Sequence, residues 1–291
     1  MQPYKWDALD YAKSSSAQQQ WARELIGKLQ LKGDETLLDI GCGDGKVTAE
    51  LAACSPMGSV LGVDSSAEMI ALAQSQYPAT AFPNLRFQKE DARSLPFHDE
   101  FTVVFSNATL HWVLDHAPVL QGIFASLKRG GRALLQMGGR GNTVDVIAVA
   151  EHVIASQEWR GYFEGFSFPY GFYGPDEYRE WLREAGLQAR RVELIPKDAA
   201  HRGREGFEGW FRTTWLPYTQ RVPEEKREAF IAQVVDRYLE NHPPDEQGMV
   251  HVKMVRLEVE ALKLWPHHCR GIPDIEPEGT SLWKFKMCLS A

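Results

Sequence analysis

Residues 37–48 read Leu-Leu-Asp-Ile-Gly-Cys-Gly-Asp-Gly-Lys-Val-Thr, and this stretch decides how the chain folds. Its apolar start predicts a buried strand, and a helical segment is expected from Lys46 onward. Between the two, glycine occupies every second position: Gly41, Gly43 and Gly45. Glycine adopts positive φ at little cost and lets a ligand approach the bare backbone. Because the following helix points its N-terminus at this turn, we predict that the turn holds a nucleotide.

The glycine spacing discriminates between two kinds of nucleotide. A dinucleotide-binding turn has the pattern Gly-x-Gly-x-x-Gly, whereas Lys46 stands here where the third glycine is required. The spacing therefore argues against a bound pyrophosphate, with NAD kept as an alternative. The stretch resembles motif I of the class I S-adenosylmethionine-dependent methyltransferases, including the acidic residue, Asp39. This resemblance covers about residues 15–137 and implies S-adenosylmethionine as the cofactor and S-adenosylhomocysteine as the product.

Composition and charge limit what the chain can be. Its 291 residues, 44% of them hydrophobic, suffice for one substantial core. The net charge of −7 argues against a large nucleic-acid footprint, which depends on basic residues that neutralise phosphates. The cysteines have no metal-ligand spacing, and the neighbouring side chains of His267, His268 and Cys269 diverge too much to hold a metal ion. Without an apolar signal segment or membrane-length run, we expect a cytoplasmic protein with no membrane partner.

The first half of the chain alternates strands with helices. The expected strands are Thr36–Ile40, Ser59–Val63, Leu85–Gln88, Phe101–Ser106 and Arg132–Met137. The expected helices are Ala17–Leu29, Lys46–Ala53, Ser66–Gln76 and Ala117–Leu127, the last closed by Gly130 and Gly131. Buried strands separated by helical spacers are typical of a parallel, doubly wound sheet.

The second half has a different pattern, with more helices. Helices are expected near Val144–Glu158, from Pro175 to Gly186, and at Arg204–Trp215 and Glu224–Glu240. Two further strands are expected at Gln188–Leu194 and Met249–Val259, the second suited to antiparallel pairing. With the resemblance, this predicts an α/β fold: a doubly wound, mostly parallel seven-stranded Rossmann-like sheet, with a mainly helical cap over the carboxyl ends of its strands. We expect an N-terminal helical lid (1–30), a cofactor-binding core (31–140), cap helices with the remaining strands (141–262) and a tail (263–291).

Several residues stand where an expected strand ends and would face the nucleotide. Asp64 lies about twenty residues past the glycine turn, where a carboxylate can accept both ribose hydroxyls. Asp91 can accept from an adenine amino group while the Ala92 backbone contacts a ring nitrogen. Met69 can lie against the purine face, and Asn107 is expected beside the sulfonium and its methyl group.

Each of these residues also has an ordinary structural explanation. Asp64 and Asp91 can be helix caps or loop aspartates, Asn107 a turn residue and Met69 a core residue. Their occurrence in order after successive strands favours the nucleotide interpretation. The cofactor-binding residues implied by the resemblance are Tyr11, Ser15, Asp39, Gly41, Cys42, Gly43, Asp64, Ser65, Met69, Asp91, Ala92 and Asn107.

A narrower resemblance concerns the methyl acceptor. Segments 6–11, 14–18 and 106–112 are similar to those of the trans-aconitate 2-methyltransferases and related carboxylate methyltransferases, among them the insect juvenile hormone acid methyltransferases. This similarity implies a small-molecule acceptor that is methylated on a carboxylate to give a methyl ester. No catalytic residue is certain, and the substrate-orienting candidates are Gln18, His111 and Trp112.

The chemistry of ester formation suits the residues of this chain. A carboxylate is ionised at pH 7, so it needs orientation rather than a general base. Neither a Ser-His-Asp set nor a pair of catalytic carboxylates follows the fourth expected strand. Arginines of the expected cap can hold additional carboxylates of an acceptor, although a single arginine is more often a solvated surface residue. The candidates are Arg140, Arg160, Arg202, Arg204 and Arg212.

Three questions stay open at the level of the sequence. The acceptor can instead be a phenolic, amine or carbon nucleophile, in which case His111 becomes a candidate base. The chain can also be a non-catalytic module that binds the cofactor and regulates a partner. The aromatic residues of segment 159–173 either line an apolar pocket for a long substrate or pack the cap onto the sheet. We expect a monomer or a homodimer.

Overall fold

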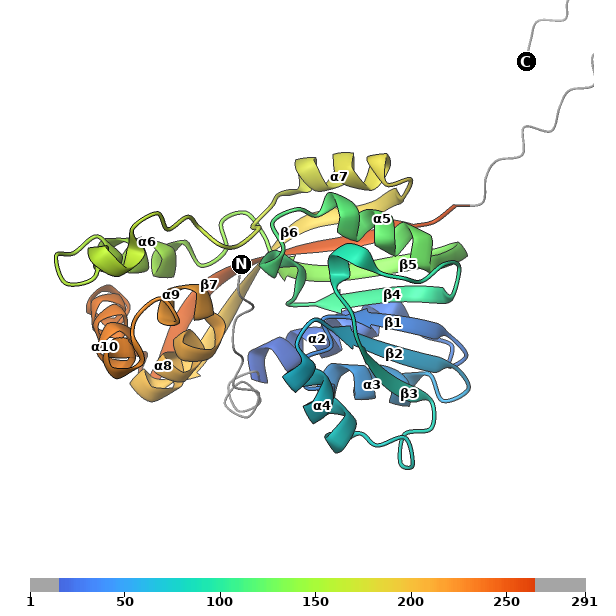
Figure 1. The fold of residues 1–291 in the computed structure, drawn as a ribbon, viewed down its shortest axis with the longest axis horizontal. Helices are drawn as coiled ribbons and strands as arrows, with labels where there is room; N and C mark the ends of the chain where they lie inside the picture. The colour runs from blue at the N-terminus through green and yellow to red at the C-terminus, as the bar shows by residue number, and fades with distance from the viewer. Residues whose placement is uncertain (1–15, 265–291) are drawn as a thin grey trace, which may run out of the picture.

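The computed structural model describes residues 16–264, without the side chains of residues 16–18 and 20 (Figure 1). Its centre is a seven-stranded sheet in the order β3-β2-β1-β4-β5-β7-β6. The strands are β1 (Thr36–Ile40), β2 (Ser59–Asp64), β3 (Leu85–Lys89), β4 (Phe101–Asn107), β5 (Leu127–Gly138), β6 (Gln188–Arg202) and β7 (Met249–Leu262). Strands β1 to β5 pair in parallel, whereas β7 runs antiparallel to both β5 and β6. The predicted doubly wound, mostly parallel sheet is confirmed.

Helices cover both faces of this sheet (Figure 1). One face carries α2 (Ser16–Leu29), α3 (Lys46–Cys54) and α4 (Ala67–Gln76), and the other carries α5 (Ala117–Ser126) and α7 (Pro175–Glu184). Each face has its own buried core: Phe105 of β4 lies in the core under α2–α4, and Tyr178 of α7 lies in the core between the sheet, α5 and α7. Parallel sheets are typically covered by helices on both faces, and their strands are therefore apolar on both sides.

The remaining α-helices form a separate lobe, on the side of the sheet where the parallel strands end (Figure 1). The lobe consists of α6 (Val144–Ile154), α8 (Gly203–Thr214), α9 (Leu216–Thr219) and α10 (Glu224–Asn241). It is built on the outer parts of β6 and β7, where residues 196–202 pair with residues 249–255 beyond the end of β5. The lobe corresponds to the predicted helical cap, whereas the proposed four-part division of the chain stays a prediction.

Several elements differ in extent from the sequence-based expectation. Strand β6 continues past Leu194 to Arg202, through Pro196 and several polar residues. These residues are compatible with a strand because β6 lies at the edge of the described sheet and pairs there with β7 alone. Strand β5 begins at Leu127, so Gly130 and Gly131 lie within it instead of ahead of it. Helix α6 ends at Ile154, and β7 continues to Leu262. Three short 3-10 helices were not predicted: η1 (Ala92–Ser94), η2 (Leu110–Trp112) and η3 (Arg160–Phe163).

The aromatic segment 159–173 largely packs the lobe. Trp159 is 1% exposed, and its ring centroid lies 5.2 Å from that of Phe230 on α10. Phe163 stacks on the same Phe230 ring at 5.6 Å, and Tyr170 meets Trp215 at 5.7 Å. Of the two alternatives for this segment, packing accounts for these buried rings, whose contacts stabilise the lobe.

Candidate active site

The glycine turn after β1 has the backbone that its sequence predicts. The amides of Gly41 and Cys42 both donate to the carbonyl of Val63, at 2.7 and 3.0 Å, which fastens the turn to the end of β2. The φ angles of Gly41, Gly43 and Gly45 are +77°, +54° and +84°. All three lie in the left-handed region that favours glycine.

The three glycines serve different purposes. A Cβ atom at Gly41 would lie 2.0 Å from Thr109, and one at Gly45 would lie 2.7 Å from the Phe87 ring. A side chain at Gly41 or Gly45 would clash with the protein itself, so the fold requires glycine at both positions. A Cβ atom at Gly43 would meet no atom of the described chain within 4 Å. The backbone at Gly43 thus borders open space, as a ligand cradle requires.

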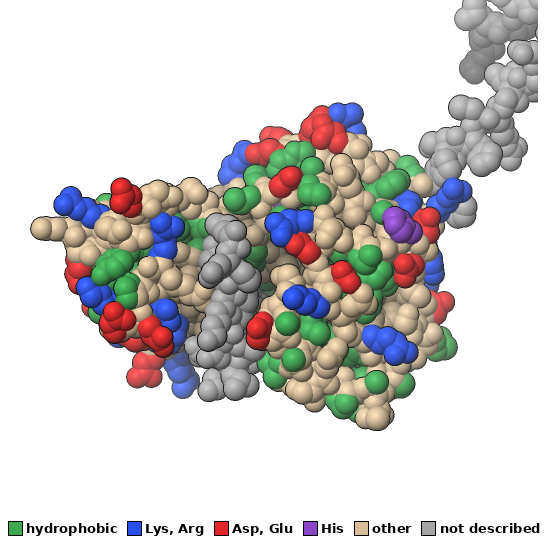
Figure 2. Space-filling model, in the orientation of Figure 1, with side chains coloured by type: hydrophobic (Ala, Val, Ile, Leu, Met, Phe, Trp, Pro, Cys, Tyr) green, Lys and Arg blue, Asp and Glu red, His purple; other side chains and the backbone are tan. Residues whose placement is uncertain are grey.

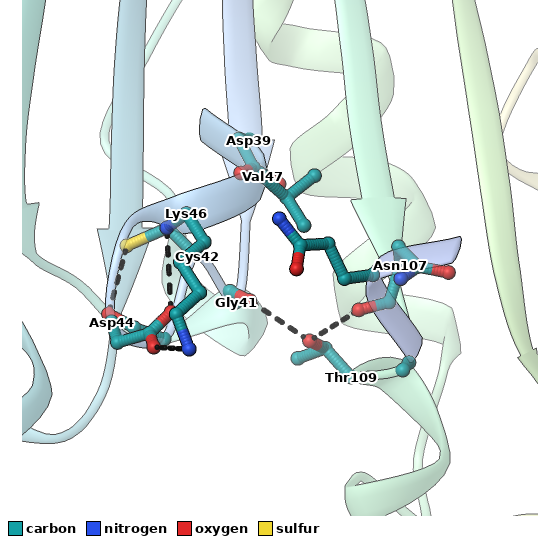
Figure 3. A pocket seen from close by; sticks show the side chains of 11 residues that line it. Asp39, Gly41, Cys42, Asp44, Lys46, Val47, Asn107 and Thr109 are labelled. Carbon is teal, nitrogen blue, oxygen red and sulfur yellow. Dashed lines mark hydrogen bonds and ion pairs between the residues drawn. The ribbon is translucent and has the colours of Figure 1, made fainter. Parts of the chain in front are cut away.

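A pocket lies between this turn and the end of β4. Figure 3 shows Cys42, Asp44 and Lys46 on one side of it, and Asn107 and Thr109 on the other. The Thr109 hydroxyl lies 3.1 Å from the Gly41 carbonyl and 3.2 Å from the Asn107 carbonyl, so it ties the ends of β1 and β4 together. The full lining is Gln19, Asp39, Gly41, Cys42, Gly43, Asp44, Lys46, Val47, Asn107, Ala108 and Thr109.

Carboxylates dominate the charge around the turn. Asp39 is 2% exposed and accepts from the Thr48 hydroxyl at 2.7 Å; burial raises the pKa of Asp39 to about 7, and the nearby Asp64 adds to the rise. Asp64 accepts from the backbone amides of Gly43 at 3.0 Å and Ser66 at 2.9 Å. Burial raises the pKa of Asp64 too, against the effect of these hydrogen bonds.

Asp44 is also buried and forms an ion pair with Lys46 at 3.0 Å. With Asp39 and Asp64 ionised, the turn carries three carboxylates against this one lysine. Such a surrounding favours a cationic ligand and disfavours a pyrophosphate.

The candidate residues that follow β2 and β3 lie at the same end of the sheet as the glycine turn, next to the end of β1. Ser66 caps α4 by accepting from the Met69 amide at 3.2 Å, and the Met69 side chain is buried. Asp91 caps η1 by accepting from the Arg93 amide at 2.9 Å. The Asp91 carboxylate also pairs with the Arg93 guanidinium at 2.5 Å, which lowers the pKa of Asp91. A ligand group that approaches Asp91 must therefore share it with Arg93.

His111 stands in η2, directly after β4. Its Nδ1 lies 3.4 Å from the backbone amide of Gly138 and is the acceptor there, so the ring proton sits on Nε2. The rings of Trp112, Tyr170 and Phe172 surround the imidazole, with centroids 5.9 to 6.1 Å away. Burial lowers the pKa of His111 well below its usual value, and the positive charge of Arg256 lowers it further. His111 is therefore neutral near pH 7.

The structure brings part of the predicted set into one pocket. Asp39, Gly41, Cys42, Gly43 and Asn107 line it together. Asp64 is not part of the lining but is bonded to Gly43, which is. The other described candidates lie outside the lining: Ser65, Met69, Asp91, Ala92, His111 and Trp112. Tyr11 and Ser15 lie outside the described residues, as does the side chain of Gln18. The contacts of all these residues with a cofactor stay predictions.

Sequence reasoning missed some residues of the lining. Gln19 reaches it from α2 and donates to Glu50 at 2.7 Å. Ala108 has a φ of +56°, which is unusual for a residue with a side chain and which no sequence signal announced. Asp44, Lys46, Val47 and Thr109 complete the missed group.

The arginines expected in the cap have other surroundings. Arg140 pairs with Glu177, Arg204 with Asp236, and Arg212 with Glu228. Arg160 and Arg202 are exposed. Arg256 on β7, which was not among the predicted arginines, is only 4% exposed.

Two properties of the described residues bear on possible membrane and metal partners. None of the helices in residues 16–264 is both long and apolar enough to cross a bilayer. Within the same residues no three His, Cys, Asp or Glu side chains gather in a way that could hold a metal ion.

Comparisons with known proteins agree with this geometry. The family model of the methyltransferase domain matches residues 38–135. A trans-aconitate 2-methyltransferase of Deinococcus radiodurans is 30% identical over 223 residues, which are 75% of this chain and 83% of that protein. An uncharacterized methyltransferase of Schizosaccharomyces pombe is 30% identical over 197 residues, 66% of this chain and 74% of that one.

A solved structure extends the likeness to the fold. The crystal structure of a putative methyltransferase from Bacillus halodurans superimposes with a TM-score of 0.58, at 17% identity, covering 84% of this chain and 99% of that one. The glycine turn, the acidic surroundings and these relatives agree, and the alternative of NAD falls away. The chain belongs to the class I S-adenosylmethionine-dependent methyltransferases, and S-adenosylmethionine is its cofactor.

Proposed function

We propose that this enzyme transfers the methyl group of S-adenosylmethionine to a carboxylate oxygen of a small-molecule acceptor, giving a methyl ester. The observation that carries the proposal is the state of His111. This residue is buried and neutral, and its Nδ1 is turned to the Gly138 amide. A histidine with so low a pKa is a weak general base, so the site suits a nucleophile that is already ionised.

The cofactor would lie along the carboxyl ends of β1, β2 and β4. The open space at Gly43 and the carboxylates of Asp39 and Asp64 suit a ligand that carries a sulfonium and an ammonium group. We assign the ribose hydroxyls to Asp64 and the adenine to Met69, Asp91 and the Ala92 backbone. Tyr11, Ser15, Cys42, Ser65 and Asn107 complete the proposed set.

Methyl transfer to a carboxylate requires little of the protein beyond the orientation of the two substrates. The bound cofactor supplies an activated methyl group, which a carboxylate oxygen takes as the carbon–sulfur electron pair returns to sulfur. No proton moves in this step, so the residues serve to bind, align and exclude water. His111 can donate its Nε2 proton to an acceptor oxygen, and Trp112 beside it can form a wall. Gln18 keeps its proposed orienting role from the N-terminal side.

Methylation of a phenolic, amine or carbon nucleophile is the competing function. It would require a base near the acceptor, and the lowered pKa of His111 counts against that role. The names of relatives such as the trans-aconitate 2-methyltransferase of Deinococcus radiodurans also favour a carboxylate. A cytoplasmic location and a monomeric or homodimeric state stay predictions.

The first test is the pH profile of kcat and the nature of the product. With both substrates saturating, we expect kcat to stay flat from pH 6 to pH 9, because carboxylate and His111 keep their protonation states. The product should release labelled methanol when it is treated with base, as an ester does. A kcat that rises with pH through neutrality, or a base-stable methyl label, would instead identify a phenol or an amine as the acceptor.

A further inference from the structure

We propose that Gln19 binds the ammonium group at the amino-acid end of the cofactor, and that Glu50 and Arg23 hold Gln19 in position for this contact. The inference rests on the position proposed above for the cofactor and extends it to a residue of α2, outside the glycine turn. It concerns only how the cofactor is held, so it does not depend on the nature of the methyl acceptor.

The pocket between the glycine turn and β4 suits one particular end of the cofactor. Its lining includes Asn107, which is expected beside the sulfonium and its methyl group. The residues assigned to the ribose and the adenine do not line it: Asp64, Met69, Asp91 and Ala92. Because the sulfonium joins the adenosine to the amino-acid part of the cofactor, this pocket is left for the amino-acid part.

Gln19 reaches the pocket from the N-terminal part of α2. Among the α2 residues whose side chains the structure describes, it alone belongs to the lining. Its Nε2 donates to Oε1 of Glu50 on α3 at 2.7 Å. The Gln19 amide therefore has α3 on its nitrogen side and borders the pocket as well.

The charge of Glu50 decides which way the Gln19 amide faces. Burial raises the pKa of Glu50, but the hydrogen bonds from Arg23 and Gln19 lower it overall, so the carboxylate is ionised near pH 7. An ionised carboxylate only accepts hydrogen bonds, so the nitrogen of the amide must face it. The amide oxygen lies on the other branch, directed away from Glu50, and is an acceptor for an ammonium group.

Arg23 holds Glu50 in place from the solvent side. Its Nε donates to Oε2 of Glu50 and its Nη2 to Oε1, both at 2.9 Å, which is the paired geometry of a guanidinium on a carboxylate. Arg23 follows Gln19 by four residues, so the two side chains share one face of α2. Glu50 thus fixes both side chains to α3, the helix that begins directly after the glycine turn.

The surrounding charges also favour an ammonium group at this place. Asp39 and Asp44 line the same pocket, and Glu50 lies behind Gln19. Negative charges around a small pocket attract a cation and repel the carboxylate of the cofactor. Because Gln19 is already held by Glu50, less side-chain freedom is lost when the ligand binds.

The test compares three ligands by titration calorimetry. They are S-adenosylhomocysteine, its analogue without the α-amino group, and methylthioadenosine, which has no amino-acid part. The wild type should bind S-adenosylhomocysteine more tightly than the other two. In Gln19→Met this affinity should fall roughly 10- to 100-fold, the usual effect of losing a hydrogen bond to a charged group. The affinities for the deaminated analogue and for methylthioadenosine should change little.

The positioning role of Glu50 has its own variants. Glu50→Ala leaves Gln19 in the chain without its support and should weaken S-adenosylhomocysteine by a smaller factor, about three- to tenfold, with methylthioadenosine unchanged. Glu50→Gln keeps an acceptor for the Gln19 amide and should restore part of the affinity. The matched control is Glu24→Gln, which breaks an ion pair between α2 and Lys197 on β6 and should leave all three affinities intact.

The outcomes decide each part of the inference. If Gln19→Met weakens methylthioadenosine as much as S-adenosylhomocysteine, or weakens neither, Gln19 does not bind the amino-acid end. If it weakens S-adenosylhomocysteine and the deaminated analogue equally, Gln19 contacts the carboxylate, and the ammonium assignment is refuted. An effect of Glu24→Gln as large as that of Glu50→Ala would refute the positioning role.

Failure of this inference is distinct from failure of the proposals on which it rests. If folded Gly43→Val binds S-adenosylhomocysteine normally, the cofactor lies elsewhere, and the assignment of Gln19 fails with its proposed position. If Gly43→Val loses binding while Gln19→Met does not, the role of Gln19 fails alone. Ester formation is tested separately, because none of these titrations contains an acceptor.

Discussion

At the level of single residues, the buried Asp39 carboxylate makes the glycine turn sensitive to pH. Its pKa is raised to about 7 because it is removed from water and lies near Asp64, with Thr48 as the hydrogen-bond donor that opposes the rise. A cationic cofactor favours the ionised carboxylate, so binding should release a proton wherever Asp39 is still protonated in the free enzyme.

Cofactor affinity should therefore rise with pH up to about 7 and level off above it, by at most roughly tenfold per pH unit. Calorimetry at pH 6 in two buffers of different ionisation enthalpy measures the proton release directly. Asp39→Asn keeps an acceptor for Thr48 and should abolish this part of the pH dependence. An unchanged pH dependence in that variant would assign the effect to another group, the amino group of the cofactor included.

Asp64 should matter both for the cofactor and for the turn. Its carboxylate accepts from Gly43 and Ser66 and is assigned to the ribose hydroxyls. Asp64→Ala should weaken cofactor binding roughly 10- to 100-fold and cost about 1–3 kcal/mol of stability, with the protein still folded. Titration calorimetry and thermal unfolding measure the two effects, and an unchanged affinity would remove Asp64 from the site.

The sequence predicts residues of this site unequally. Asp39, Asp64 and Asn107 were found because each stands at a strand end, and strand ends of a parallel sheet converge. Gln19 was missed, since one step along a helix turns a side chain by about 100° and periodicity alone did not identify the neighbour that faces the pocket. The contact between His111 and the Gly138 amide was not predicted, because the two residues are distant in sequence and only the packing of η2 against β5 brings them together.

At the level of elements, the turn from β1 to α3 separates residues that serve the fold from those that serve the ligand. Gly41→Ala should destabilise the protein strongly, because its Cβ atom would lie 2.0 Å from Thr109. A Cβ atom at Gly43 meets no atom of the described chain within 4 Å, so we expect Gly43→Val to cost mainly the strain of positive φ, about 1–2 kcal/mol. The expected Gly43→Val protein is folded but does not bind the cofactor.

Circular dichroism and titration with S-adenosylhomocysteine distinguish these effects. A Cβ atom at Gly43 meets no atom of the described chain within 4 Å, so the valine is expected to clash with the ligand rather than within the turn. Normal binding by folded Gly43→Val would contradict the cradle. Equal loss of structure in both variants would contradict the division of roles.

The bounds of the helices and strands were harder to predict than whether a segment is a helix or a strand. The parallel strands were located closely because covered strands are short apolar runs between glycine and helix signals. The outer half of β6 was missed, because Pro196, Lys197 and Asp198 break the apolar pattern in a strand that pairs, among the described strands, with β7 alone. Edge strands that carry a lobe have no second neighbour to impose that pattern.

At the level of the whole molecule, the lobe and the sheet are stabilised by different cores. The lobe core includes residues of α6, α8 and α10 with the outer strands, whereas two other clusters pack the faces of the parallel sheet. Helix α2 links the two parts, since Trp21 belongs to the lobe core while Leu25 belongs to the sheet. Figure 2 displays the lobe and the sheet as two masses side by side. Damage to one core should therefore affect the two halves of the reaction unequally.

Phe230→Ala tests this separation. Phe230 is fully buried, and its ring contacts Trp159 and Phe163, so its loss should cost about 3–5 kcal/mol. Because the glycine turn lies outside the lobe, we expect binding of S-adenosylhomocysteine to persist while methyl transfer falls. Hydrogen exchange should quicken in α6, α8 and α10 before it does in β1 and β4. The matched control is Phe105→Ala, an equal truncation in the sheet, which should weaken product binding and methyl transfer together. If both variants lost binding and transfer in the same proportion, the lobe and the sheet would form a single cooperative unit, and the acceptor side could not be altered independently of the cofactor side.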